Sequence, residues 1–160
     1  MPPDQIDQQI DLAREARNYS EEFMLFPRFW RDYAYPRALT WVTAPFDPAG
    51  RAVIPDASGV YAFLVQPGVA PVLNGSYIMY VGQAKSLYER YGDYLAEARG
   101  TGKRIHTREM FRNYAGYLHF TYALVPEAEI TEAEDALIEA LWPPMNYQVP
   151  ATIRGAVRIV

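Results

Sequence analysis

The sequence predicts one α+β domain, in which a small mixed or antiparallel β-sheet of about three core strands is flanked by helices. A chain of 160 residues with 50% hydrophobic content buries roughly two thirds of its unfolded surface, which is enough for one compact core. Short apolar runs rich in β-branched and aromatic residues recur at residues 60–65, 77–81 and 117–125. Capping patterns open helices between and after these runs. Strands and helices that mix in this way are typical of an α+β fold.

The first 57 residues predict an extension outside the main domain. Apolar Ile6, Ile10 and Leu12 among polar residues predict an amphipathic helix that runs to about residue 18 and packs on the outside of the domain. Residues 19–57 combine aromatic residues and prolines without sustained periodicity. We expect an irregular segment there that wraps the domain, with one strand at residues 39–43.

A β-hairpin and a helix are expected next. Residues 60–65 and 77–81 read as buried strands, and the connection between them carries Asn74-Gly75, a strong turn signal. Ser86 and Glu89 match a capping box, which predicts a helix that stops near Gly100.

The second half of the domain continues the pattern. We expect a helix over residues 104–114 and a third core strand over residues 117–125. Thr131 and Glu134 match another capping box, and the helix that they begin must end at Pro143, because proline cannot continue a helix. The main domain therefore spans residues 58–148, and residues 149–160 form a C-terminal strand or tail.

Composition excludes several kinds of site. The chain has no cysteine, so disulfides, thiolate nucleophiles and cysteine-ligated metals are absent. Two histidines cannot build a histidine-rich site, so a bound metal would be held by carboxylates and water, which favours Mg²⁺ or Mn²⁺. The first residues lack a basic and then apolar leader pattern, and no run approaches the ~20 apolar residues of a membrane span. We therefore expect a cytoplasmic protein without membrane contact.

The distribution of charge gives mixed evidence about nucleic acid. A net charge of −4, from 15 basic and 19 acidic residues, is unusual for a nucleic-acid-binding protein. Residues 99–112, however, carry basic side chains against a single acid, Glu109. This segment either faces phosphates or is an ordinary solvated helix face. The candidate nucleic-acid-binding residues in and near it are Lys85, Lys103, Arg104, Arg108 and Arg112.

One carboxylate is out of place in a purely structural interpretation. On the last predicted helix, Leu137, Ile138 and Leu141 follow Glu134 at three, four and seven residues, so Glu134 points where the core stripe points. An ionised carboxylate there is costly unless it is paired, hydrogen-bonded or bound to a metal. Helix geometry alone leaves two interpretations open, because Glu134 would also close the capping box at Thr131.

A second set of residues is ordinary one by one. Arg90 and Tyr94 lie four residues apart on one face of a predicted helix, as a surface arginine covering an aromatic ring would. Tyr61 and Tyr80 would be unremarkable on strands. Asn146 follows the Pro-Pro stop as a turn residue would.

The spacing of these residues resembles that of a known family. Tripeptides 59–61 and 80–82 read Gly-Val-Tyr and Tyr-Val-Gly, Arg90 follows Tyr80 by ten residues, and Tyr94 follows it by fourteen. Downstream, Glu134 leads through an apolar pair and a proline to Asn146. Over residues 58–148 the chain resembles the GIY-YIG nuclease family, and the predicted order of strands and helices agrees with the fold of that family.

The resemblance implies a site and a chemistry. It implies a divalent-metal-dependent endonuclease that hydrolyses phosphodiester bonds in DNA, restriction-like or repair-like. Its implied catalytic residues are Tyr61, Tyr80, Arg90, Tyr94, Glu134 and Asn146. Glu134 would hold Mg²⁺, with Mn²⁺ as an alternative, and Arg90 would bind the phosphate. Tyr61 would be the general base, with Tyr80 as the second candidate.

The remaining roles and the departures from the family follow from the same comparison. Tyr94 would hydrogen-bond phosphate or water, and Asn146 would brace the region of Glu134. Gln83 stands where many members carry a lysine, and Lys85 is the nearby residue that would replace it.

Two other functions compete with cleavage. The first is a nucleic-acid-binding module on the same fold with weak or lost catalysis, which the net charge and Gln83 favour. The second is a protein-interaction role, in which residues 1–57 bind a partner or a second copy of the chain. Salt separates the two, because nucleic-acid binding weakens steeply as salt rises.

Overall fold

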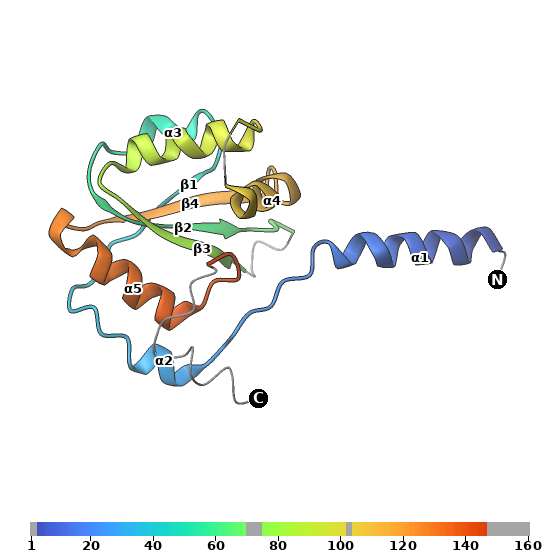
Figure 1. Cartoon of the computed structure of the whole chain (residues 1–160), viewed down its shortest axis with the longest axis horizontal. Helices are drawn as coiled ribbons and strands as arrows, with labels where there is room; N and C mark the ends of the chain where they lie inside the picture. Colours follow the sequence, from blue (N-terminus) through green and yellow to red (C-terminus); the bar gives the residue numbers. More distant parts are fainter. Residues whose placement is uncertain (1–2, 70–74, 102–103, 147–160) are drawn as a thin grey trace.

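The structure, a computed structural model, describes residues 3–69, 75–101 and 104–146, and within them four strands form one antiparallel sheet (Figure 1). The strand order is β1-β4-β2-β3. Their bounds are Val42–Pro45 for β1, Gly59–Val65 for β2, Tyr77–Ala84 for β3 and Leu118–Leu124 for β4. The predicted α+β class is confirmed. The sheet has four strands where about three were expected, and β1 begins three residues later than predicted.

Helices cover both faces of the sheet (Figure 1). Helices α3 (Leu87–Ala98) and α4 (Ile105–Asn113) lie on one face, and α5 (Ile130–Leu141) lies on the other. Because successive side chains of a strand point to opposite faces, Tyr61 and Phe63 of β2 pack with α3, whereas Val60 and Ala62 pack with α5. Burial on both faces explains why β2 is apolar at every position.

Gly82 lets the Tyr61 ring lie against the neighbouring strand. The two residues are direct partners in the antiparallel pairing of β2 with β3. A Cβ atom at residue 82 would lie 2.5 Å from Cζ of Tyr61, closer than any real carbon contact. Glycine at residue 82 is therefore required by the tyrosine opposite it and not by a turn.

We expect Gly82→Ala to lower the free energy of unfolding by about 1–3 kcal/mol, because overpacking of this size forces the Tyr61 ring to move. Urea denaturation measures the change. The same substitution should cost less in a Tyr61→Leu background, where the ring is absent. Equal costs in the two backgrounds would contradict this account.

The helix starts show which capping predictions are right. Ser86 caps α3 as predicted: its Oγ accepts a hydrogen bond from the backbone N–H of Glu89 at 3.1 Å. The capping box predicted for Thr131 and Glu134 is wrong. Helix α5 begins at Ile130 after a short 3-10 turn, η2 (Glu127–Glu129), and its N-cap residue makes no side-chain cap. Thr131 lies inside the helix, so Glu134 has no capping role.

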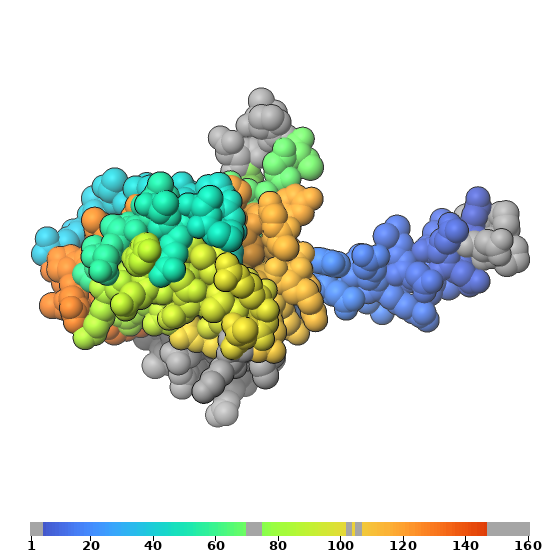
Figure 2. All heavy atoms as spheres, turned by 90° about the horizontal axis from the view of Figure 1, so that it is seen from above, coloured from blue at the N-terminus to red at the C-terminus, as the bar shows by residue number. Residues whose placement is uncertain are grey.

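The N-terminal helix differs from its prediction in its surroundings. Helix α1 (Pro3–Arg17) forms as expected, but it projects away from the sheet in two views (Figures 1 and 2). Ile6, Ile10 and Leu12 are 43–66% exposed. The expectation that this helix packs on the domain is wrong, because its apolar stripe is narrow and meets no apolar surface of the sheet or its helices.

Residues after α1 do contact the domain. The Tyr19 ring packs against Tyr114 with centroids 6.2 Å apart, and Arg37 makes two hydrogen bonds of 2.7 Å to the carboxylate of Glu129. Two short helices here were not predicted, α2 (Pro27–Arg31) and the 3-10 turn η1 (Gly50–Val53). At this length no helical periodicity can show in a sequence.

Strand β3 begins where it was predicted but continues to Ala84, three residues beyond the predicted end, whereas most other elements follow their predictions closely. Helix α4 and strand β4 each begin and end within a residue of the expected bounds, and α5 ends before Pro143. The predicted C-terminal strand or tail over residues 149–160, the turn at Asn74 and the side chain of Lys103 lie outside the described residues. Within the described ranges, no helix combines the length and apolar character that crossing a bilayer requires.

Candidate active site

Three tyrosines meet on the α3 face of the sheet. Tyr61 comes from β2, Tyr80 from β3 and Tyr94 from α3. The hydroxyl oxygens of Tyr61 and Tyr94 are 2.8 Å apart, and the rings of Tyr61 and Tyr80 have centroids 6.3 Å apart. Tyr61 and Tyr94 are buried, whereas Tyr80 is partly exposed. The structure therefore brings together three residues that the sequence comparison had singled out at separate positions.

Burial keeps two of these hydroxyls protonated. Removal from water raises the pKa of Tyr61 well above the ordinary phenol value, and the hydroxyls of Tyr94 and Tyr80 add to the effect. Burial likewise raises the pKa of Tyr94. At neutral pH both side chains are neutral phenols, which donate and accept hydrogen bonds.

Arg104 brings a positive charge to the cluster from the N-terminal end of α4. Its Nη1 donates to the hydroxyl of Tyr94 at 3.4 Å, and its guanidinium carbon lies 5.7 Å from the centre of the Tyr94 ring. The same side chain forms an ion pair with the buried Glu97 at 3.7 Å. Arg104 is therefore both a member of the basic segment and a neighbour of the tyrosines.

Glu134 faces strand β3 from α5. Its Oε2 accepts a hydrogen bond of 2.7 Å from Nε2 of Gln83, whose Oε1 in turn accepts one of 3.1 Å from the hydroxyl of Thr131. Partial burial raises the pKa of the Glu134 carboxyl, and the hydrogen bond from Gln83 works in the opposite direction. In the sequence, Gln83 stands out only as a departure from a family pattern, and no local pattern pairs it with Glu134.

The positive charge of Arg90, on α3, acts on both Tyr61 and Glu134. Burial has the largest influence on the pKa of Tyr61 and on that of Glu134 and raises both, while the positive charge of Arg90 lowers both. Its side chain is partly exposed and forms no ion pair or hydrogen bond with another described residue. The partly exposed guanidinium is thus available to an anion that approaches from the solvent.

Asn146 braces the edge of the sheet. Its Oδ1 accepts from the backbone N–H of Val81, and its Nδ2 donates to the carbonyl oxygen of the same residue, both at 2.8 Å. Strand β3 is an edge strand, so this side chain takes the place of a neighbouring backbone. Asn146 therefore ties the chain after α5 to the strand that carries Tyr80 and Gln83.

We expect Asn146→Asp to lower the free energy of unfolding by about 1–3 kcal/mol. The carboxylate keeps an acceptor for the Val81 N–H but turns a second oxygen toward the Val81 carbonyl, which needs a donor. Denaturant unfolding measures the loss. Asn113→Asp is the matched control, because its amide makes only exposed hydrogen bonds, to the carbonyl oxygen of Asn18 at 3.3 Å and from Nε of Arg112 at 3.5 Å. Equal stability of the two variants would contradict the bracing role.

The other basic candidates lie farther from the cluster. Lys85 is exposed and pairs with Glu127 at 2.6 Å, so it does not take a place beside the tyrosines. Arg108 and Arg112 are exposed on α4, four residues apart on one face. Together with Arg104 they give α4 a basic surface next to the tyrosine cluster.

The donor set around Glu134 fits a hard divalent cation. Among the described residues, no group of three or more histidine, cysteine, aspartate or glutamate side chains gathers at one place. A cation bound at Glu134 would be held by that carboxylate, with water and phosphate oxygens in the remaining positions. Mg²⁺ and Mn²⁺ accept such a shell, whereas zinc sites use more protein ligands.

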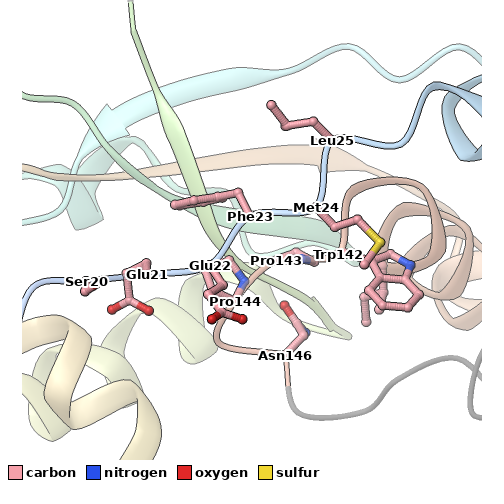
Figure 3. A pocket seen from close by; sticks show the side chains of 11 residues that line it. Ser20, Glu21, Glu22, Phe23, Met24, Leu25, Trp142, Pro143, Pro144 and Asn146 are labelled. Carbon is pink, nitrogen blue, oxygen red and sulfur yellow. The ribbon is translucent and has the colours of Figure 1, made fainter. Parts of the chain in front are cut away.

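A pocket of about 760 Å³ lies beside this site and is distinct from it (Figure 3). It runs between residues 20–25 of the extension and residues 142–146 after α5, and Glu22, Trp142 and Asn146 are among its lining side chains. The tyrosine cluster, Arg90 and Glu134 do not line it. The candidate active site is therefore not part of this pocket, although Asn146 adjoins both.

Comparisons with known proteins add one similarity. No family model matches the chain, and no curated protein matches it. Among solved structures, three point mutants of the GIY-YIG N-terminal endonuclease domain of UvrC from Thermotoga maritima, each bound to a catalytic divalent cation, are similar. Their TM-scores are 0.43–0.44 and their identities 21–23%, over 61% of this chain and 91% of that domain. The similarity concerns the fold alone and assigns no activity to this chain.

Proposed function

We propose that this chain is a Mg²⁺-dependent DNA endonuclease of the GIY-YIG type, which hydrolyses phosphodiester bonds. The observation that carries the proposal is the tyrosine cluster on the α3 face, in which the hydroxyls of Tyr61 and Tyr94 are 2.8 Å apart, with the charge of Arg90 acting on both Tyr61 and Glu134. A phosphate bound at Arg90 would meet a guanidinium, a carboxylate that suits a divalent cation, and the partly exposed Tyr80. Hydrolysis of a phosphodiester needs such a combination of charge and hydrogen bonding.

Each charged residue has one task in the proposed reaction. Glu134 would hold a divalent cation, which when bound would polarise the phosphate and stabilise the leaving 3′ oxygen. Arg90 binds the phosphate oxygens, and its hold strengthens as charge gathers on them in the transition state. Asn146 holds the end of α5 against β3 through its two hydrogen bonds to Val81, so that residues from both elements can act on one phosphate.

The tyrosines divide between contact and support. A phenol removes a proton from water only as the phenolate, and burial of Tyr61 opposes that form. Tyr80 is partly exposed, so we assign to it the contact with the attacking water. Tyr61 then has a supporting role, with its hydroxyl hydrogen-bonded to that of Tyr94. Tyr61 would act as the base only if bound cations offset the effect of burial on its pKa.

The surface of α4 is the proposed path of the DNA backbone. The phosphates would be bound by Arg104, Arg108 and Arg112. The contribution of such contacts to DNA affinity depends on salt concentration and not on DNA sequence. Target choice, restriction-like or repair-like, would then rest with residues 1–57 and the loops near the site. Sequencing the cut ends from a random DNA library separates these roles.

Cleavage of supercoiled plasmid DNA by the purified chain tests the proposal. Nicked and linear products should form with Mg²⁺ or Mn²⁺ and disappear with EDTA. A fluorescence measurement of DNA binding at rising salt runs beside it, and affinity should fall steeply. Binding without any metal-dependent nicking would overturn the nuclease and support a binding module. A salt-resistant complex with protein only would support the interaction role of residues 1–57.

A further inference from the structure

We propose that Gln83 is a positioning residue for the metal-binding carboxylate: it holds Glu134 in the orientation that a divalent cation needs. This inference rests on the proposed function. Gln83 itself touches neither substrate nor metal in this account, and it acts through Glu134.

The contacts join one strand to one turn of helix. Gln83 belongs to β3, and its backbone pairs with Val60 of the doubly buried strand β2. Its amide reaches two residues of α5 that lie three apart, Thr131 at 3.1 Å and Glu134 at 2.7 Å. Residues at this spacing lie on one face of a helix. The amide therefore bridges both residues from a fixed point on the sheet.

The amide suits a carboxylate that must also bind a cation. A carboxylate has two oxygens with about four acceptor sites, and the Gln83 side chain occupies one of them, on Oε2. The donor is neutral, so it orients Glu134 without cancelling the negative charge that attracts the metal. A lysine or arginine at the same distance would compete with the cation for that charge.

Thr131 selects the orientation of the amide. Its hydroxyl donates to Oε1 of Gln83, which leaves the NH₂ group to face Glu134. Without this donor the amide is free to turn its oxygen toward the carboxylate, where it would repel. The structure therefore contains a relay from Thr131 through Gln83 to Glu134.

A purely structural tie between β3 and α5 is the competing explanation. The chain already has such a tie, because Asn146 joins the residues after α5 to Val81 by two hydrogen bonds. The experiment must therefore measure metal affinity as well as stability. Gln83→Met keeps the length of the side chain and removes its two hydrogen bonds, whereas the backbone N–H of Gln83, which also acts on the Glu134 carboxyl, is unchanged.

Titration of the full chain with Mn²⁺, followed by electron paramagnetic resonance of the free ion, tests the proposal. We expect Gln83→Met to weaken Mn²⁺ binding by about 10-fold or more, with the chain still folded at the temperature of the titration. Thr131→Val should weaken it less, and the double variant should match Gln83→Met, because Thr131 acts through the same amide. Gln66→Met is the matched control, since the Gln66 amide is also hydrogen-bonded, to Ser76 at 2.9 Å, but not to Glu134.

Cleavage gives a second readout of the same kind. Gln83→Met should need a higher Mg²⁺ concentration for half-maximal rate and should regain most of its rate at saturating metal. Wild-type Mn²⁺ affinity in Gln83→Met would overturn this inference and leave the nuclease proposal standing. If Glu134→Gln binds Mn²⁺ as tightly as the wild type does, the metal site at Glu134 is wrong, and this inference falls with it.

Discussion

Glu134→Gln is expected to lower the rate of DNA cleavage by on the order of 100-fold or more. The substitution keeps the size of the side chain and its acceptor for the Gln83 amide, and it removes only the negative charge that would hold the cation. Initial rates of plasmid nicking at fixed Mg²⁺ measure the effect. Full activity in this variant would remove Glu134 from the mechanism.

We expect the same variant to be more stable than the wild type, although it is less active. Partial burial raises the pKa of Glu134 above its ordinary 4.5, so the ionised carboxylate is less favourable in the folded chain than in the unfolded one. The contribution of Glu134 to stability is then fully present below pH 4.5 and is lost as the pH rises through the raised value. At pH 7 without metal, Glu134→Gln should therefore unfold at a higher urea concentration than the wild type.

The pH dependence checks that sign. The stability difference between Glu134→Gln and the wild type should shrink as the pH falls through the carboxyl pKa, because a protonated carboxyl and an amide are both neutral. Glu132→Gln is the matched control, since Glu132 is exposed on the same helix. It should change neither cleavage nor stability. Lower stability of Glu134→Gln at pH 7 would mean that the carboxylate is a structural partner.

Arg90→Lys is expected to reduce cleavage by roughly 100-fold although the charge is retained. A guanidinium presents a planar set of donors that matches two phosphate oxygens, whereas an ammonium is a single point charge. The interaction is expected to strengthen in the transition state, so kcat should fall more than the affinity for DNA. Single-turnover cleavage of a labelled duplex, with anisotropy for binding, separates the two quantities.

Arg99→Lys is the control for Arg90→Lys. Arg99 ends the same helix and is exposed, and its replacement should leave cleavage within about 2-fold, because it keeps the charge and has no planar site to match. An Arg90→Lys variant with wild-type kcat would show that only the charge at residue 90 matters, and the assigned phosphate contact would be wrong.

The sequence by itself determined most of the fold and the composition of the candidate site. The periods of the strands, the Ser86 cap and the prolines after α5 are local signals, and the elements that they predicted are present. Local patterns of this kind are readable because backbone geometry repeats over a few residues. The grouping of Tyr61, Arg90 and Glu134 in one site came instead from the resemblance to the GIY-YIG family.

Only the tertiary structure decided how those residues are connected. Thr131 and Glu134 matched a capping box, but η2 starts the helix earlier and both side chains turn to Gln83, 48 and 51 positions away in the sequence. Asn146 finds its partner in Val81, 65 positions away. A hydrogen bond between distant residues depends on how a strand and a helix pack, and no local period records it. The burial that keeps Tyr61 protonated is decided in the same way, by helices that close over the sheet.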